Sequence, residues 1–506
     1  MKASPSATRR TTKNVIIALL VFSSLIILVF YFVDIDSTLA VAVKKSTGWT
    51  QYIFKPKQSE TLIPKKNKIH YSLNCTTTNR TQTCPRKLPV IDKDYQSPSL
   101  SSCPDYFNWI HEDLQPWKET GITTEMLERA RPTANFRLVI LNGKAYVETY
   151  WRAFQTRDVF TLWGILQLLK MYPGKVPDLD LIFDCNDPPV ILSRDYKETG
   201  PNATTPPPLF RYCGSEDTLD IPFPDWSFWG WPEVNIKPWE SLLKEVNKGN
   251  KKVKWVNRVP YAYWKGNPYV ADIRGDLMKC NSSGKQDWNA RLYAQNWMAE
   301  AEKGFKHSNL AKQCTYRYKI YIEGRSWSVS QKYILACNSP TLLVKPHYYD
   351  TFTRSLLPLQ HYWPIKDNDK CPSIKFAVDW GNTHKKKAQE IGKAANNYIN
   401  KNMTMEYVYD YMFHVLNEYS KLLRFKPVIP EKAVEFCSET MACPADGLVR
   451  NFMMDTIVKS PSDTAPCILP STDPNSRASF VKKKENALQQ VEMWQSKYWE
   501  KRAKHH

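Results

Sequence analysis

The chain has 506 residues, of which 42% are hydrophobic and 13% are aromatic. This composition excludes a disordered chain and allows two or three domains of ordinary size. A formal charge of +20 would suit a nucleic-acid-binding protein, but no zinc-finger spacing or ribonucleoprotein aromatic signature accompanies the lysine runs, which argues against nucleic acid as a partner.

The first distinctive segment is an apolar run at residues 15–33. It is long enough to cross a bilayer, which needs about 20 residues. Basic residues precede it and acidic residues follow it, which predicts a cytosolic N-terminus and a lumenal remainder. A cleaved signal peptide is the alternative, because residues 40–42 resemble a cleavage site, but the run exceeds the usual apolar region of about 7 to 15 residues. We therefore expect a cytosolic tail at 1–13 and a single transmembrane signal anchor at 14–33.

Twelve cysteines follow this run. An even number without closely spaced pairs favours disulfides in an oxidising compartment over zinc or redox chemistry. Five N-x-[ST] sites agree with lumenal exposure. The predicted glycosylation sites are Asn74, Asn79, Asn202, Asn281 and Asn402.

The globular part begins near Cys103 with a predicted hairpin and a helix. Segments 137–141 and 145–150 flank Asn142-Gly143, a pattern typical of a tight β-turn. The apolar segment 158–171 predicts a helix that ends before a Pro-Gly pair.

Short apolar runs then alternate with helical segments. Strands are expected at 180–183, 261–264, 316–322 and 341–344, with a helix at 328–337. This alternation indicates an α/β fold with parallel sheets.

The remaining segments differ in character. Residues 34–100 are rich in Lys, Thr, Ser and Pro and are interpreted as a stem. Apolar residues recur at helical spacing over 408–422 and 487–498, which predicts amphipathic helices packed on the body. Residues 426–474 are interpreted as part of a loop-dominated appendage.

Polar loops follow three of the predicted strands, where ligands bind in open α/β sheets. The first loop, 184–189, contains two prolines that would hold a carboxylate in a fixed direction. A fixed carboxylate suits a general base, and a turn or helix cap is the alternative for Asp184 or Asp187. Asp178-Leu179-Asp180 resembles a D-x-D metal site, but it precedes its strand, so we interpret it as a turn and expect no metal.

The second and third loops carry groups that suit an anion. Gly266 allows close backbone approach, and Lys265 and Arg274 could neutralise a diphosphate. The third loop, 323–330, combines an arginine and serine hydroxyls with the start of the predicted helix, a combination that binds phosphate. Serine is also an ordinary helix cap, which is the alternative for each position alone.

A fourth stretch, 223–232, is rich in aromatic rings that could form a sugar-stacking wall. Core packing is the alternative for most of these rings. The candidate acceptor-binding residues are Trp226, Ser227, Trp229 and Trp231.

These stretches, in this order, resemble glycosyltransferase family 90, the Rumi-like protein O-glucosyltransferase group, and are similar to its plant branch. The resemblance extends from Cys103 to Arg424. It rests on residues 176–178, 224–229, 262–266, 316–319, 324–330, 361–365 and 418–421.

The resemblance implies a GT-B fold, in which two Rossmann-like domains face a cleft. The expected parts are an acceptor-side domain at 101–245, a UDP-sugar domain at 246–395, return helices at 396–425 and an appendage at 426–506. A disulfide between Cys314 and Cys337 is also implied.

The implied reaction is an inverting, metal-independent transfer from a UDP-sugar, without a cofactor. Asp187 matches the family's catalytic base. The expected donor-binding residues are Lys265, Gly266, Asn267, Arg274, Gly324, Arg325, Ser326, Trp327, Ser328, Val329 and Ser330. Lys265 and Asn267 replace the Arg and Ser of animal members, which leaves the sugar open between glucose and xylose.

The implied acceptor is a polysaccharide or glycoprotein. Residues 504–506 are not a KDEL-type signal, so a Golgi membrane is expected, with the endoplasmic reticulum as the alternative, and anchors and stems could support an oligomer. A non-catalytic glycan-binding scaffold is the alternative function. An inverting glycoside hydrolase would need a second carboxylate, which the sequence does not nominate.

Overall fold

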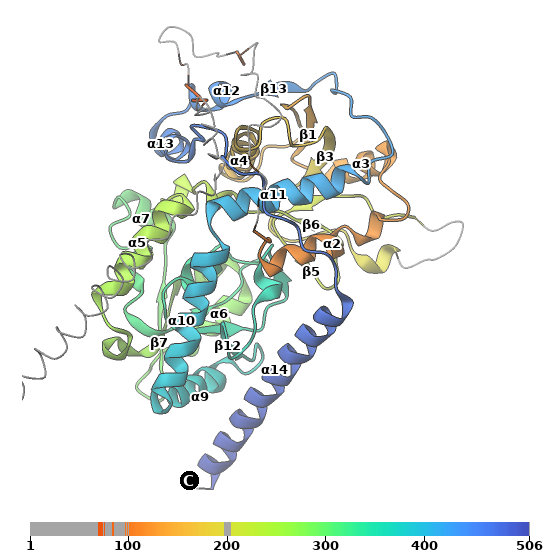
Figure 1. The fold of residues 1–506 in the computed structure, drawn as a ribbon. Coiled ribbons are helices and arrows are strands. Elements are labelled where there is room, and N and C mark those ends of the chain that lie inside the picture. Colours follow the sequence, from red (N-terminus) through yellow and green to blue (C-terminus); the bar gives the residue numbers. More distant parts are fainter. Residues whose placement is uncertain are drawn as a thin grey trace, which may run out of the picture. The chain divides into compact units, whose positions relative to one another are not determined.

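Two β-sheets organise the chain in the computed structural model, which describes residues 69–73, 75, 83–85, 97, 99, 101–196 and 204–504 (Figure 1). The first sheet has the strand order β13-β2-β1-β3-β4-β6. Its strands are β1 (Phe136–Leu141), β2 (Lys144–Thr149), β3 (Leu179–Phe183), β4 (Phe210–Arg211), β6 (Ile221–Pro222) and β13 (Val434–Phe436).

The second sheet is parallel throughout and has the order β12-β10-β9-β7-β8. Its strands are β7 (Val259–Gly266), β8 (Ala290–Ala294), β9 (Tyr316–Tyr321), β10 (Thr341–Val344) and β12 (Trp363–Ile365). A two-stranded antiparallel pair, β5 (Gly214–Ser215) with β11 (Tyr348–Tyr349), links the two halves of the chain.

Helices cover both sheets. Figure 1 shows α4 and α11 beside the first sheet, and α9 and α10 beside the second. The helices are α2 (Trp109–Asp113), α3 (Thr124–Ala130), α4 (Arg157–Met171), α5 (Trp239–Lys252), α6 (Asp272–Met278), α7 (Trp297–Glu302), α8 (Ser330–Leu335), α9 (Lys370–Thr383), α10 (Lys385–Asn402), α11 (Met405–Ser420), α12 (Ser438–Ala442), α13 (Gly447–Thr456) and α14 (Pro474–Ala503).

The local predictions are largely confirmed. Asn142 and Gly143 both have positive φ, 51° and 73°, as the turn between β1 and β2 requires. The four predicted strands correspond to β3, β7, β9 and β10. The helix expected at 328–337 is shorter, because α8 begins at Ser330 and ends at Leu335.

The predicted pair of Rossmann-like domains is wrong. The first sheet is mixed, because β1 runs antiparallel to both β2 and β3, whereas a Rossmann-like sheet is mostly parallel. Residues 66–506 also form one compact unit. Its larger hydrophobic core contains residues of both expected domains, such as Phe183 and Trp327. A second hydrophobic core lies around the parallel sheet and includes Trp264 and Ile320. The chain therefore has a mixed α/β fold with two cores, the larger of which draws on both halves.

The sequence also predicted a membrane-spanning helix before these domains. Among the described residues, no helix has both the length and the apolar character needed to span a membrane. The segment 14–33 and the tail 1–13 lie outside the described residues.

Five disulfides occur in the described chain. Three of them join residues 75–103 to the C-terminal appendage, so the described pieces of the predicted stem are attached to that appendage. The pairs are Cys75–Cys443, Cys84–Cys437, Cys103–Cys467, Cys280–Cys371 and Cys314–Cys337. His414 lies beside Cys103 and Cys467, but the disulfide uses both sulfur atoms, so this cluster is not a thiolate metal site.

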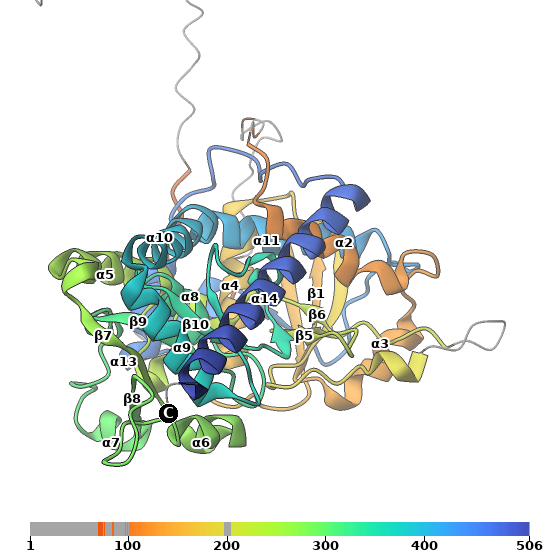
Figure 2. The same cartoon turned by 90° about the horizontal axis from the view of Figure 1, so that it is seen from below.

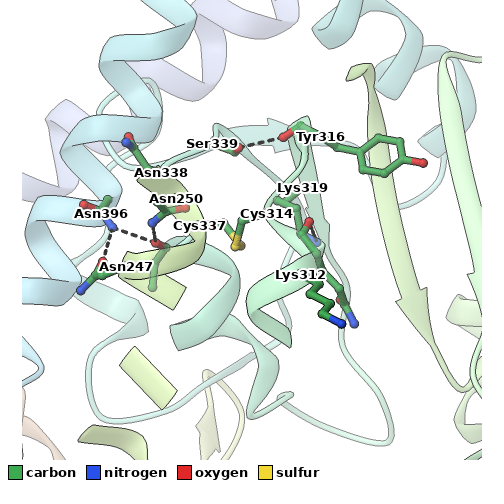
Figure 3. Close-up of a disulfide and its surroundings, with 12 residues drawn as sticks. Asn247, Asn250, Lys312, Cys314, Tyr316, Lys319, Cys337, Asn338, Ser339 and Asn396 are labelled. Atoms are coloured by element: carbon green, nitrogen blue, oxygen red, sulfur yellow. Dashed lines mark hydrogen bonds between the residues drawn. A yellow bond between two sulfur atoms is a disulfide. The ribbon is translucent and has the colours of Figure 1, made fainter. Parts of the chain in front are cut away.

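The disulfide implied by the family resemblance, Cys314–Cys337, lies between the end of α8 and the start of β9 (Figure 3). The Nδ2 atoms of Asn250 and Asn396 each donate to the carbonyl oxygen of Ala336 at 2.7 Å. These bonds satisfy a carbonyl that the end of a helix leaves free. The disulfide and the asparagines together fix the connection from α8 to the next strand.

The last helix, α14, extends along one side of the molecule (Figure 2). Near its start, the Arg477 guanidinium lies 5.2 Å from the Trp109 ring of α2. Near its end, the Trp494 ring stacks 5.8 Å from that of Trp380 in α9. The predicted amphipathic segment 487–498 therefore packs on α9, and α14 as a whole contacts both halves of the chain.

A matched pair of glycine substitutions tests the packing between α4 and the aromatic core. A Cβ on Gly164 would lie 2.4 Å from the buried Trp229 ring, so we expect Gly164→Ala to lower the free energy of unfolding by about 1–3 kcal/mol. Gly275 in α6 has its nearest neighbour 3.9 Å away, so Gly275→Ala is expected to raise it by about 0.5–1 kcal/mol. Urea unfolding measures both, and equal stability of the two variants would contradict this packing.

Candidate active site

The loop after β3 is held by a buried arginine from the neighbouring strand β4. Arg211 is 2% exposed, and its Nη2 donates to the Asp184 carboxylate. Its Nη1 donates to the carbonyl oxygens of Asn186 and Pro188. The guanidinium therefore determines the path of the whole loop, in addition to the two prolines considered from the sequence.

Asp187 extends from this loop and forms an ion pair with the first residue of α4. Its Oδ1 accepts from Arg157 Nη1 at 2.7 Å, and 30% of the Asp187 side chain is exposed. The Arg157 guanidinium lies 4.4 Å from the Trp226 ring and 5.3 Å from the Phe154 ring. The carboxylate is thus fixed in direction and still accessible, as a general base requires.

The first and third predicted loops lie together. Ser326 is fully buried, and its Oγ donates to the carbonyl oxygen of Asp187 at 2.8 Å. The thiol of Cys213 donates to the same oxygen at 3.3 Å. The loop of the candidate base and the candidate anion loop are therefore joined by the Ser326 hydrogen bond.

Arg274 of α6 brings the second loop to the same place. Its Nε donates to the Glu323 carbonyl oxygen at 2.8 Å, and its Nη2 lies 3.4 Å from Ser328 Oγ. Its Nη1 lies 3.4 Å from the carbonyl oxygen of Asn267. Burial lowers the pKa of Arg274, and the nearby Asp187 charge acts in the opposite direction. A Cβ on Gly324 would lie 3.4 Å from Arg274 Nη2, so glycine permits this close approach.

The other candidate donor residues differ in their surroundings. Lys265 Nζ donates to the His307 carbonyl oxygen at 2.8 Å, and Arg325 is exposed. Trp327 is buried, with its ring 5.6 Å from that of Tyr212. The other candidates have local contacts. Gly266 lies against the Trp264 ring, and the Asn267 side chain caps a 3₁₀ turn. Val329 precedes α8, and the hydroxyl of Ser330 is hydrogen-bonded to that of Ser328. Their roles toward a donor stay predictions.

The candidate acceptor wall is mostly interior. Trp226, Ser227 and Trp229 are at most 1% exposed, so core packing, the alternative from the sequence, describes their surroundings. Trp231 is half-buried and donates from Nε1 to Gln155 Oε1 at 2.8 Å.

The predicted glycosylation sites are only partly described. Asn74, Asn79 and Asn202 lie outside the described residues. The Asn281 Nδ2, the atom to which a glycan would be attached, donates to the Leu292 carbonyl oxygen at 3.1 Å. Asn402 is the half-buried last residue of α10.

Several residues of this site were missed from the sequence. Arg211 lies in the apolar run 209–213, and a charge in a buried strand needs a partner, which was an available signal. Arg157 at the start of a helix and Asp220 had no comparable signal. Asp220 lies beside Arg211 Nε at 3.1 Å and accepts from the backbone nitrogen of Ile191 at 2.9 Å.

The chain is similar to known glycosyltransferases. The sequence model of glycosyl transferase family 90 matches residues 98–495. An O-glucosyltransferase rumi homolog of Aedes aegypti is 24% identical over 66% of the chain and 82% of its own length. The O-glucosyltransferase rumi of Drosophila melanogaster is 23% identical over 68% of the chain and 84% of its own length. Protein O-glucosyltransferase 1 of Homo sapiens is 23% identical over 66% of the chain and 84% of its own length.

Asp220 is expected to make the free energy of unfolding of the chain depend on pH. Burial raises the pKa of its carboxyl to about 6, above the unfolded value of about 3.9. The folded chain then binds the proton more tightly, so this stabilisation is complete below about pH 4 and is lost as the pH rises through about 6. We expect the stability of the native chain relative to Asp220→Asn to fall between pH 4 and 6.5 and then to level off. Denaturant unfolding measures this, with the exposed Asp217→Asn as control; a difference that does not change with pH would contradict it.

Proposed function

The chain belongs to glycosyl transferase family 90 and is therefore a glycosyltransferase, and from this premise we propose that it transfers a sugar from a UDP-sugar to a hydroxyl of a glycan or glycoprotein. The donor sugar is glucose or xylose, and its relatives named as O-glucosyltransferases support glucose. The reaction inverts the anomeric carbon and uses neither a metal nor another cofactor.

One observation carries this proposal: Ser326 Oγ is bonded to the Asp187 carbonyl oxygen at 2.8 Å. This contact joins the loop that bears the proposed base to the loop proposed to bind the donor. A base and an anion site must lie on either side of the reacting carbon in a single displacement, and catalysis depends on such prior positioning.

In the proposed reaction, the Asp187 carboxylate takes the proton of the acceptor hydroxyl. The hydroxyl oxygen forms a bond to the anomeric carbon from the face opposite UDP. The bond from that carbon to the diphosphate oxygen breaks, and UDP leaves with the additional negative charge. Arg157 holds the carboxylate through its 2.7 Å bond and thereby orients it toward the acceptor.

The leaving diphosphate needs positive charge that is already in place. Arg274 supplies it at the centre, where its guanidinium contacts the carbonyl oxygen of Glu323 and lies close to Ser328. Lys265 and the exposed Arg325 add charge from the flanking loops. These cations allow the displacement to proceed without a metal.

The proposed setting is the Golgi lumen, with the endoplasmic reticulum as the alternative. Five disulfides support an oxidising compartment, since such bonds are rare in the cytosol.

Asp187→Asn tests the proposed base. The variant is expected to fold and to bind UDP, but to lose turnover by about 10² to 10⁴-fold, the usual effect of removing a positioned base. Release of UDP from UDP-glucose, UDP-xylose and UDP-galactose measures turnover, and thermal shift with UDP measures binding. Asp195→Asn, which removes an exposed carboxylate, serves as the matched control.

Three outcomes separate the parts of the proposal. Normal turnover by Asp187→Asn would exclude Asp187 as the base. Loss of wild-type transfer in EDTA would show that a metal is needed. A folded wild-type chain that gives no thermal shift with UDP or any of the UDP-sugars would favour a non-catalytic scaffold.

A further inference from the structure

An exposed tryptophan lies on the loop between β2 and α4, and it lines the same cavity as residues of the loop that bears the proposed base. Trp151 is 66% exposed and Phe154, on the same loop, is 63% exposed. Trp151 is the one largely exposed tryptophan among the described residues. An exposed aromatic ring at the edge of a cleft can stack on the apolar face of a ligand.

The loop that carries Trp151 is anchored rather than loose. The backbone N–H of Trp151 donates to the Asn135 carbonyl oxygen, and Asn135 Nδ2 donates to the Trp151 carbonyl oxygen, both at 3.1 Å. Asn135 Oδ1 accepts from the backbone nitrogen of Cys185 at 2.7 Å. One buried side chain thus connects the tryptophan to the loop of the proposed base.

Trp151 lies between two cavities, whose shared lining residues are Pro132 and Trp151. The first cavity, of about 440 Å³, includes both neighbours of Asp187, Asn186 and Pro188. The second, of about 540 Å³, extends away from them. Both are open to solvent rather than enclosed, and their volumes lie in the range of about 300–1,000 Å³ that ligand-binding clefts have.

The linings suit an uncharged polar ligand. The second cavity is lined by two carboxylates and two cations, Glu128, Glu148, Arg131 and Lys432, so its charges balance. The first combines the amides of Asn135 and Asn186 with an Asp184 that Arg211 neutralises and with Arg152, whose charge acts on Asp158. A peptide would instead seek apolar pockets or a free strand edge. Aromatic rings among hydrogen-bonding side chains fit the apolar faces and hydroxyl edges of sugar rings.

We propose that these two cavities are consecutive acceptor subsites for a neutral oligosaccharide, with a sugar ring stacked on Trp151 between them. This assignment rests on the proposed function and adds the class of acceptor. The sugar that receives the new unit occupies the cavity beside the Asp187 loop, and the preceding units occupy the cavity that Lys432 lines. The acceptor is therefore recognised over at least two sugar units.

Binding of neutral oligosaccharides of defined length tests this assignment. The probes are gluco-, xylo-, galacto- and manno-oligosaccharides of one to six units, titrated into the full chain with UDP present and followed by calorimetry. For at least one series, affinity should rise from one unit to three and then level off. Trp151→Ala should weaken binding of two or more units about five- to tenfold, as expected for the loss of one stacked ring.

Two further variants make the test specific. Lys432→Ala should weaken binding of the longer oligosaccharides and leave single units unchanged. Phe154→Ala removes an exposed ring of the same loop that lines neither cavity. Because this ring lies against Arg157, the control is followed by oligosaccharide affinity, which it should retain, and not by turnover. A thermal shift with UDP checks that each variant is folded.

The outcomes distinguish this inference from the proposed function. If UDP and UDP-sugars bind but no oligosaccharide does, the subsites are wrong and the transferase proposal stands. Equal weakening by Trp151→Ala and Phe154→Ala, affinity independent of length, or transfer to a peptide that Trp151→Ala leaves unaffected would each overturn the subsites. Failure of UDP to bind would instead refute the proposed function.

Discussion

The rest of the site depends on the contacts of one buried group, the guanidinium of Arg211. It lies between two buried carboxylates, Asp184 and Asp220, and transferring such ions from water costs several kcal/mol each. The cluster persists because each charge is paired and the remaining hydrogen bonds are made to loop backbone, including that of Pro188 and Ile191. Such a cluster contributes less to stability than to determining a single path for the loop.

Once this loop is fixed, the two halves of the chain meet in one place. Asp187 presents its carbonyl oxygen to Ser326, and a second buried ion pair joins Lys332 of α8 to Asp225 at 3.0 Å. The ammonium of Lys332 also donates to Ser227 Oγ at 2.7 Å, which explains why a serine is buried among tryptophans. The proposed base and anion site are therefore positioned by contacts within the chain itself, as electrostatic preorganisation requires.

Local features were predicted well from the sequence because their causes are local. The turn at Asn142-Gly143 requires positive φ, and the strands and the later amphipathic helices follow from apolar periodicity. The three candidate loops were also found, because chain order places them after strands. The direction of the strands was not predicted. β1 pairs antiparallel with β3, and apolar periodicity does not determine whether two strands run parallel or antiparallel. The partner of Asp187 was missed for a similar reason: Arg157 is distant in the sequence and is brought near only by the packing of α4.

Asn135 connects the loop of the proposed base to the loop that carries the exposed tryptophan. It is 4% exposed, and its side chain bonds the Cys185 backbone on one side and the Trp151 backbone on the other. The distance from the exposed ring to the base loop is therefore set by one short amide rather than by a long loop. If the ring holds an acceptor sugar, its separation from Asp187 determines which unit of the acceptor reaches the base. Selection of the acceptor would then depend on the same buried hydrogen bonds that hold the fold together.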